Sequence, residues 1–292
     1  MLRIFVNVAN NVAIKSLQHY PSNNLKFYKI AKCQMISEIL QKNKQLLDEV
    51  IQLGKSITFL RKDNIDRLLK VFLDRQLSLA TSINILLRKK QYYESCMLMP
   101  TLLENHILVI YLISFDKIID YLEYACIESL PQLKIYPEEK AETLNFIKNH
   151  NVVRFFNDKL EKSDDNLLNP KNYKKAPWYN IESMVQQLIS KGNVDIRQTK
   201  DHYDLFCAYK HSQPFNILQR MTFERIDNDA VISSGVACCA LLQGYALILS
   251  KHPLEYLIKK QRELTDQFNG LQEEFRKNYD TFKKESELLY NR

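Results

Sequence analysis

The chain has 292 residues, of which 46% are hydrophobic and 26% charged, and a formal net charge of +7 at pH 7. This size and balance are typical of a globular protein with a sizeable core, and they exclude a disordered chain or a disulfide-dependent miniprotein. Only 5 glycines occur. Sheet-rich folds use glycine repeatedly at tight turns and phosphate loops, so the composition favours helices. The 6 cysteines form no C-x-x-C pair and the amino-terminal segment lacks the apolar core of a signal peptide, so we expect a cytoplasmic protein.

Apolar residues recur at helical spacing through most of the chain. The pattern predicts helices over residues 36–54, 64–90, 97–115 and 116–126. The third of these is apolar almost all round, which is typical of a helix in the middle of a core. Pro137, followed by two acidic residues, predicts the first turn of a further helix.

Residues 162–180 contain two prolines, several turn-forming residues and the only tryptophan, Trp178, and we expect a long surface connection there. Helices are predicted to resume after Asn180, a suitable N-cap, and again near Thr199. Residues 214–229 alternate weakly and fit either an extended strand or an irregular loop.

Residues 230–250 carry no charge and are long enough to cross a bilayer. The segment also contains small and polar residues such as Ser233, Gly235 and Gln243, and we find no second span to pair with it. Small residues let helices approach closely in a protein core as well as in lipid. We therefore interpret it as a buried central helix, and we do not expect a membrane partner.

A final helix is predicted from Pro253 to Tyr290. Its apolar residues form a heptad-like seam. They are Leu257, Leu264, Phe268, Leu271, Phe275, Phe282 and Leu289. The seam fits either packing along the bundle or a homodimer contact. The patterns together predict an all-α fold, a multi-helix bundle with a buried central helix and a long C-terminal amphipathic helix. We divide it into an N-terminal segment (1–55), a core domain (56–252) and the C-terminal helix (253–292).

The positive charge is concentrated in residues 42–90, which contain eleven basic residues and five acidic ones. A basic helical surface can bind the phosphates of RNA. No aromatic interleaving or nucleic-acid motif accompanies the charges, so we interpret them first as a solvated helix surface and keep RNA binding as the alternative.

Glu104, Asn105 and His106 form a polar group inside the most apolar helix. A buried carboxylate needs a cation or a hydrogen-bond donor, so we expect a lysine, arginine or histidine close to Glu104. Glu104 is then either part of an internal ion pair or a functional residue whose carboxyl pKa is shifted. Pro100, one turn earlier, removes a helical hydrogen bond and predicts a kink.

Tyr203, Cys207 and His211 lie four residues apart and share one helix face. These side chains suit acid–base catalysis or phosphate binding, and they equally suit mutual hydrogen bonding in the core. Nearby, Arg197 and His202 have the spacing of the motif in HEPN ribonucleases, although about one such match is expected by chance. Nucleotide-binding and zinc-ligand motifs are missing from the sequence, so we predict no cofactor and no metal.

Three segments of the sequence resemble the bacterial family called domain of unknown function 5677. They are residues 75–112, 177–188 and 203–214. The family pattern is matched by Glu104, Tyr203 and His211. Pro100 stands where the family usually has arginine, and Cys207 where it usually has serine. The resemblance implies a helical fold and no known activity.

Two functional hypotheses follow. In the first, the protein has a regulatory role and binds a ligand or partner near Glu104, Tyr203 and His211. In the alternative, it is a HEPN-like, metal-independent ribonuclease of phage defence or stress response that uses His211, or Arg197 with His202. The second hypothesis requires a histidine and an arginine exposed together in a basic cleft.

Overall fold

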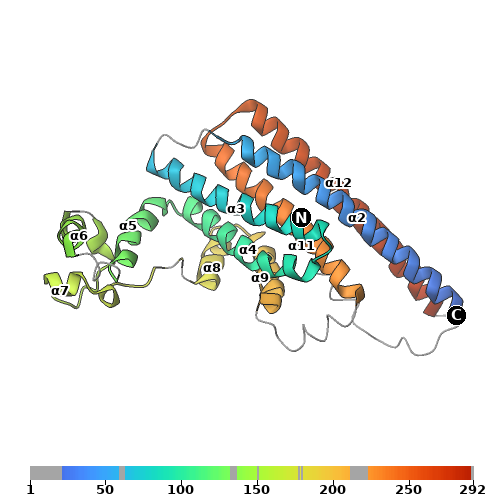
Figure 1. The fold of residues 1–292 in the computed structure, drawn as a ribbon, viewed down its shortest axis with the longest axis horizontal. Helices are drawn as coiled ribbons and strands as arrows, with labels where there is room; N and C mark the ends of the chain where they lie inside the picture. The colour runs from blue at the N-terminus through green and yellow to red at the C-terminus, as the bar shows by residue number, and fades with distance from the viewer. Residues whose placement is uncertain are drawn as a thin grey trace.

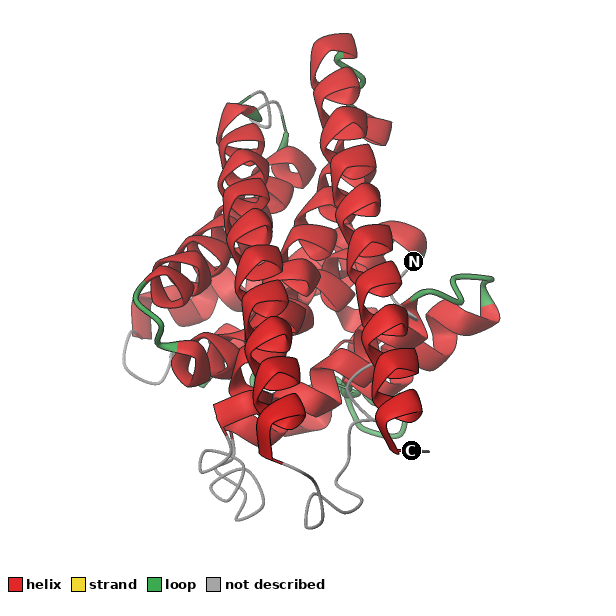
Figure 2. Ribbon diagram, turned by 90° about the vertical axis from the view of Figure 1, so that its right-hand side faces the viewer, coloured by secondary structure: helices red, strands yellow, loops and turns green. Residues whose placement is uncertain are grey.

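The computed structural model describes residues 22–58, 63–131, 137–149, 151–176, 178, 180–210 and 223–290. Within these ranges the chain consists of α-helices and two short 3-10 helices, with one isolated β-bridge between Phe156 and Tyr173. Helices joined by short connections account for the described chain in both views (Figures 1 and 2). The predicted all-α bundle is therefore confirmed.

Four long helices form the core of the bundle (Figure 1). They are α2 (Ser22–Ser56), α3 (Asn64–Arg88), α4 (Tyr92–Ser114) and α11 (Phe223–Lys251). α3 begins where the sequence pattern predicts, because the carboxylate of Asp63 accepts the backbone N–H of Asp66 at 2.8 Å. α4 continues through Pro100, whose side chain is buried. These helices bury most of their apolar side chains against one another.

The predicted central helix is confirmed in α11. Every side chain from Asp229 to Leu242 is buried, and α11 packs against α2, α3 and α4. Small side chains on α11 let α2 approach closely enough for Asn43 to donate a hydrogen bond to Ser234 at 3.1 Å. The helix begins at Phe223, so residues 223–229 are neither a strand nor a loop, while residues 214–222 lie outside the described residues.

Two helices are long and apolar enough to cross a membrane by length and composition, and the sequence analysis recognised one of them. In Asp229–Lys251, a window of 18 residues has a mean hydropathy of 1.8, and 83% of its residues are buried in the fold. In Tyr92–Ser114, a window of the same length has a mean hydropathy of 1.6, and 67% of its residues are buried. The expectation that no second such segment exists is therefore wrong. Both helices lie mostly in the core of the fold, and a helix that is buried on every side is apolar all round.

The C-terminal helix α12 (Glu255–Tyr290) packs along α2 and α11, and Figure 1 shows α2 and α12 side by side over most of their length. Its seam is buried at Leu257, Leu264, Phe268 and Phe275. Lys42 of α2 also pairs with Glu274 of α12 at 2.5 Å. The seam therefore packs within one chain as far as Phe275. The side chains of Phe282 and Leu289 lie outside the described residues, and the homodimer stays a prediction.

A small lobe projects from one end of the bundle (Figure 1). It comprises α5 (Ile118–Ser129), α6 (Pro137–Asn149), η2 (Asn151–Phe155), α7 (Asp164–Leu167) and η3 (Pro170–Asn172). α6 starts at Pro137, as predicted. The prediction of a surface connection is wrong for Trp178. Trp178 is 8% exposed and its ring lies 5.5 Å from those of Tyr121 and Tyr124, so this connection contributes to the core.

The helices α8 (Ile181–Ser190) and α9 (Ile196–Lys210) pack on α4 and on each other. α8 begins after Asn180, whose side chain accepts the backbone N–H of Ser183 at 3.1 Å, which confirms the predicted N-cap. α9 buries Ile196, Thr199, His202, Phe206 and Tyr209. This packing places Tyr203 of α9 beside Glu104 of α4.

Candidate functional site

Glu104 of α4 and Tyr203 of α9 meet where the two helices pack together. The Tyr203 hydroxyl donates a hydrogen bond to Glu104 Oε1 at 3.0 Å, and both side chains are partly exposed. The expected donor is therefore present and is a tyrosine. The expected cation is not there: within the described residues, no lysine, arginine or histidine pairs with Glu104. The structure thus brings together two of the three residues predicted for the leading site.

Cys207 lies one turn beyond Tyr203 on α9 and is partly exposed. Burial raises the pKa of the Tyr203 hydroxyl well above its usual value, and the neighbouring Cys207 and Glu104 raise it further. Burial likewise raises the pKa of the Cys207 thiol; the Tyr203 hydrogen bond opposes this rise and the charge of Glu104 adds to it. Both groups therefore keep their protons at neutral pH. Tyr203 acts as a hydrogen-bond donor, and Cys207 is a poor nucleophile because the thiolate is the reactive form.

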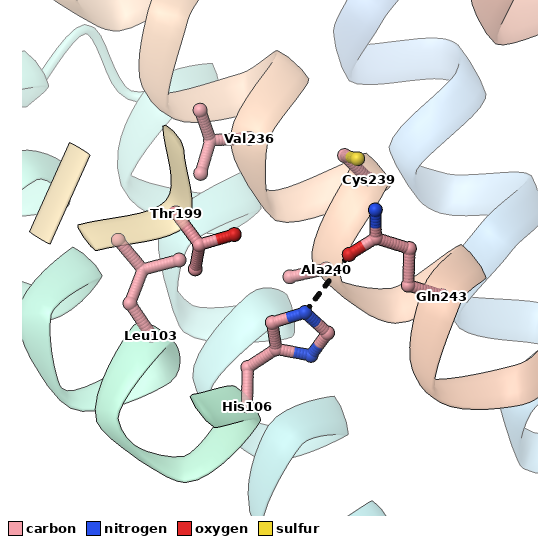
Figure 3. Close-up of a pocket in the computed structure, with 7 residues that line it drawn as sticks. All are labelled: Leu103, His106, Thr199, Val236, Cys239, Ala240 and Gln243. Atoms are coloured by element: carbon pink, nitrogen blue, oxygen red, sulfur yellow. Dashed lines mark hydrogen bonds between the residues drawn. The ribbon is translucent and has the colours of Figure 1, made fainter. Parts of the chain in front are cut away.

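His106 occupies a second polar position, one layer deeper than Glu104. Its Nε2 lies 3.0 Å from Gln243 Oε1 of α11, and the side chain is 1% exposed. Figure 3 shows this contact beside a cavity that Leu103, Thr199, Val236, Cys239 and Ala240 also line. Burial lowers the pKa of His106 to about 4, although the bond to Gln243 raises it. The imidazole is therefore neutral at neutral pH.

The cavity beside His106 has a volume of about 10 Å³, which is room for roughly one water molecule. Pockets that hold an organic ligand measure about 300–1,000 Å³. This cavity is therefore too small for a metabolite or a nucleotide. In the sequence, His106 stands out only as part of the polar group with Glu104 and Asn105. Its contact with Gln243 joins positions 137 residues apart, and no local pattern could reveal it.

Arg197 and His202 are not brought together. Arg197 is exposed, whereas His202 is 0% exposed, with its Nδ1 2.7 Å from the backbone oxygen of Gln198. Five residues turn an α-helix by about 140°, so the two side chains leave α9 in different directions. Burial also lowers the pKa of His202. His211, the other histidine proposed for catalysis, lies outside the described residues.

Several basic side chains of residues 42–90 are paired with acids in the fold. Arg88 bonds Asp48, and Lys70 bonds Asp74 within α3. Such contacts partly neutralise the surface that was considered for RNA. No group of three or more histidine, cysteine, aspartate or glutamate side chains that could hold a metal ion occurs in the described part of the chain.

The fold and the site define an all-α bundle protein with a polar cluster between α4 and α9. The chain belongs to the family of unknown function DUF5677, whose model matches residues 66–229, more than half of the chain. The match begins in α3 and ends in α11, so it contains Glu104, Tyr203 and Cys207. No curated protein and no solved structure matches the chain.

Proposed function

We propose that the protein is an interaction module that binds a protein partner through one surface, here called the α4–α9 face. This face consists of Thr101, Glu104 and Leu108 of α4 with Tyr203 and Cys207 of α9, all partly exposed. The three α4 residues follow the i, i+3, i+7 spacing that places side chains in one row. One observation carries the proposal: a carboxylate in the most apolar helix is held at the surface by a single tyrosine hydroxyl, with no cation on it among the described residues.

The protonation states favour binding over catalysis. A general base or a nucleophile works best when its pKa lies near or below neutral pH. The pKa values of Tyr203 and Cys207 are both raised by burial, so neither side chain provides an anion at neutral pH. The cavity beside His106 has room for roughly one water molecule. A partner that contacts the surface suits this arrangement better than an enclosed substrate.

The ribonuclease alternative gains no support from Arg197 and His202. It requires both side chains in one exposed cleft, and His202 is 0% exposed. It then depends on His211 alone. A direct control is to incubate the protein with RNA in EDTA: cleavage that His211→Ala abolishes, in a variant that still folds, would replace our proposal with the ribonuclease.

Photo-crosslinking in the cell tests the proposal. A photoreactive amino acid replaces Met97, which is 36% exposed and lies one turn before Thr101 on α4. The control position is Tyr256 of α12, which is 65% exposed and lies on a helix that packs on α2 and α11. We expect position 97 to trap a defined protein, identified by mass spectrometry, and Glu104→Gln to reduce that adduct about tenfold. No adduct, or an adduct that Tyr256 also traps or that Glu104→Gln leaves unchanged, would overturn the proposal.

A further inference from the structure

Among the described residues, no basic side chain pairs with the Glu104 carboxylate. Its hydrogen bond from Tyr203 adds no positive charge, because that hydroxyl is neutral. Lys200 of α9 bonds two other carboxylates, those of Asp204 at 2.7 Å and Glu182 at 3.1 Å, and its ammonium group lies 6.0 Å from the centroid of the Tyr203 ring. The pairs of this lysine are therefore with acids other than Glu104.

The carboxylate of Glu104 also acts on the Cys207 thiol in the middle of the face. Burial raises the pKa of this thiol, the charges of Glu104 and Asp204 raise it further, and the Tyr203 hydrogen bond and the positive charge of Lys210 oppose them. These two carboxylates are opposite in sign to the net charge of the chain, which is +7.

Apolar and aromatic surfaces lie beside the carboxylate. Leu108 and the side chain of Met97, which is 36% exposed, flank Glu104 along α4. The ring of Tyr203 lies on the α9 side and is itself partly exposed. An apolar surface next to a carboxylate suits a side chain with a long aliphatic stem and a cationic end. Lysine and arginine have this form, because they bury the stem on apolar surface and keep the charged end at a polar group. An aromatic ring adds a cation–π contact, which arginine makes more often than lysine.

We infer that the α4–α9 face receives an arginine side chain of a partner protein, with the guanidinium on the Glu104 carboxylate and the stem along Leu108. This inference rests on the proposed function and specifies the chemistry of the partner. A planar guanidinium can bond a carboxylate through two N–H groups and stack flat on an aromatic ring, whereas an ammonium group is a compact point charge. The net charge of +7 repels a strongly basic partner, so the arginine is expected in an otherwise neutral or acidic segment.

The test compares N-acetyl-arginine amide with N-acetyl-citrulline amide, which has nearly the same shape without the charge. Nuclear magnetic resonance of the full chain follows the backbone amide signals of α4 and α9 during titration. We expect the arginine probe to shift signals around Glu104 and Tyr203, with the citrulline probe binding several times more weakly. Glu104→Gln should abolish the difference between the probes. Glu49→Gln removes the same charge from an exposed position on α2 and should preserve it.

Equal binding of the two probes, shifts confined to other helices, or an unchanged preference in Glu104→Gln would overturn the inference. The two proposals can fail separately. A protein trapped at position 97, together with equal binding of the two probes, would leave the interaction module in place and remove the arginine. If position 97 traps no protein, the proposal that the α4–α9 face binds a protein partner is rejected. The proposal that this partner contributes an arginine is then rejected with it.

Discussion

The close approach of α2, α3 and α11 at Gly54 predicts a large response to one added methyl group. A Cβ atom at this position would lie 2.3 Å from the Tyr245 hydroxyl oxygen and 2.6 Å from Leu77 Cδ2. Tyr245 is 0% exposed, and its hydroxyl donates a hydrogen bond to the Val50 backbone oxygen at 3.0 Å. Neither neighbour has solvent to move into, so Gly54→Ala must displace the tyrosine or the helix.

The expected cost follows from three contributions. Overpacking a core costs about 1–3 kcal/mol. Separating the Tyr245 hydroxyl from Val50 leaves a buried donor without its partner, which costs about 1–3 kcal/mol. Replacing glycine by alanine in a helix returns about 1 kcal/mol. We therefore expect Gly54→Ala to lower the free energy of unfolding by about 3 kcal/mol.

The assay is urea unfolding followed by circular dichroism, with Gly270→Ala as the matched control. Gly270 is exposed in α12, and a Cβ there meets nothing within 4 Å. The control should be stabilised by about 0.5–1 kcal/mol, because only helix propensity changes. Tyr245→Phe removes the nearest clashing atom and should lower the cost of a following Gly54→Ala. A Gly54→Ala protein as stable as the wild type would refute the close approach.

Three further predictions concern stability. His106 has a pKa of about 4 in the fold against an ordinary 6.5, so its contribution is complete above pH 6.5 and declines as the pH falls, by up to about 3 kcal/mol at pH 4. Urea unfolding of His106→Gln across this range should show a shallower decline, and an unchanged decline would contradict the burial. Asn180→Ala removes the cap on Ser183 and should cost about 1 kcal/mol in the same assay. Lys191 donates to the Ser114 backbone oxygen at the end of α4, and Lys191→Met should lower the melting temperature slightly, with a loss of about 0.5 kcal/mol. No change in either variant would show that these end contacts do not stabilise the fold.

Local features of the sequence predicted the elements whose causes are local. Asn180 caps α8 through a residue three positions away, and Pro137 starts α6 because its ring suits the first turn of a helix. The uncharged residues after Asp229 form the buried α11 because a helix surrounded by others must be apolar on every side. α4 is also surrounded by other helices and is apolar for the same reason. Its polar residues Glu104 and His106 make its similarity to a membrane span less evident in the sequence.

Contacts between distant residues explain what the sequence did not reveal. Trp178 follows turn-forming residues, and only its packing on Tyr121 and Tyr124 of α5 shows that the segment is anchored. Residues 203 and 207 were recognised as one face of a helix, but the residue opposite them depends on how α9 lies on α4. Spacing within a helix determines which residues are neighbours on its surface. It does not determine which other helix packs against them.

The stability of Glu104 variants separates a binding residue from a structural one. A carboxylate that holds the core together through an ion pair costs about 3–5 kcal/mol when it is removed. Among the described residues Glu104 bonds only Tyr203, at 3.0 Å, and a partly exposed hydroxyl can turn to water when its acceptor is lost. We therefore expect Glu104→Met, which keeps the volume and removes the charge from an apolar helix, to raise the free energy of unfolding by up to about 1 kcal/mol. The same variant should lose the preference for arginine over citrulline. A binding residue often stabilises the free protein less than an apolar replacement does, which is why we expect a gain in the free energy of unfolding. A decrease of about 3 kcal/mol or more would instead identify Glu104 as a structural residue of the core.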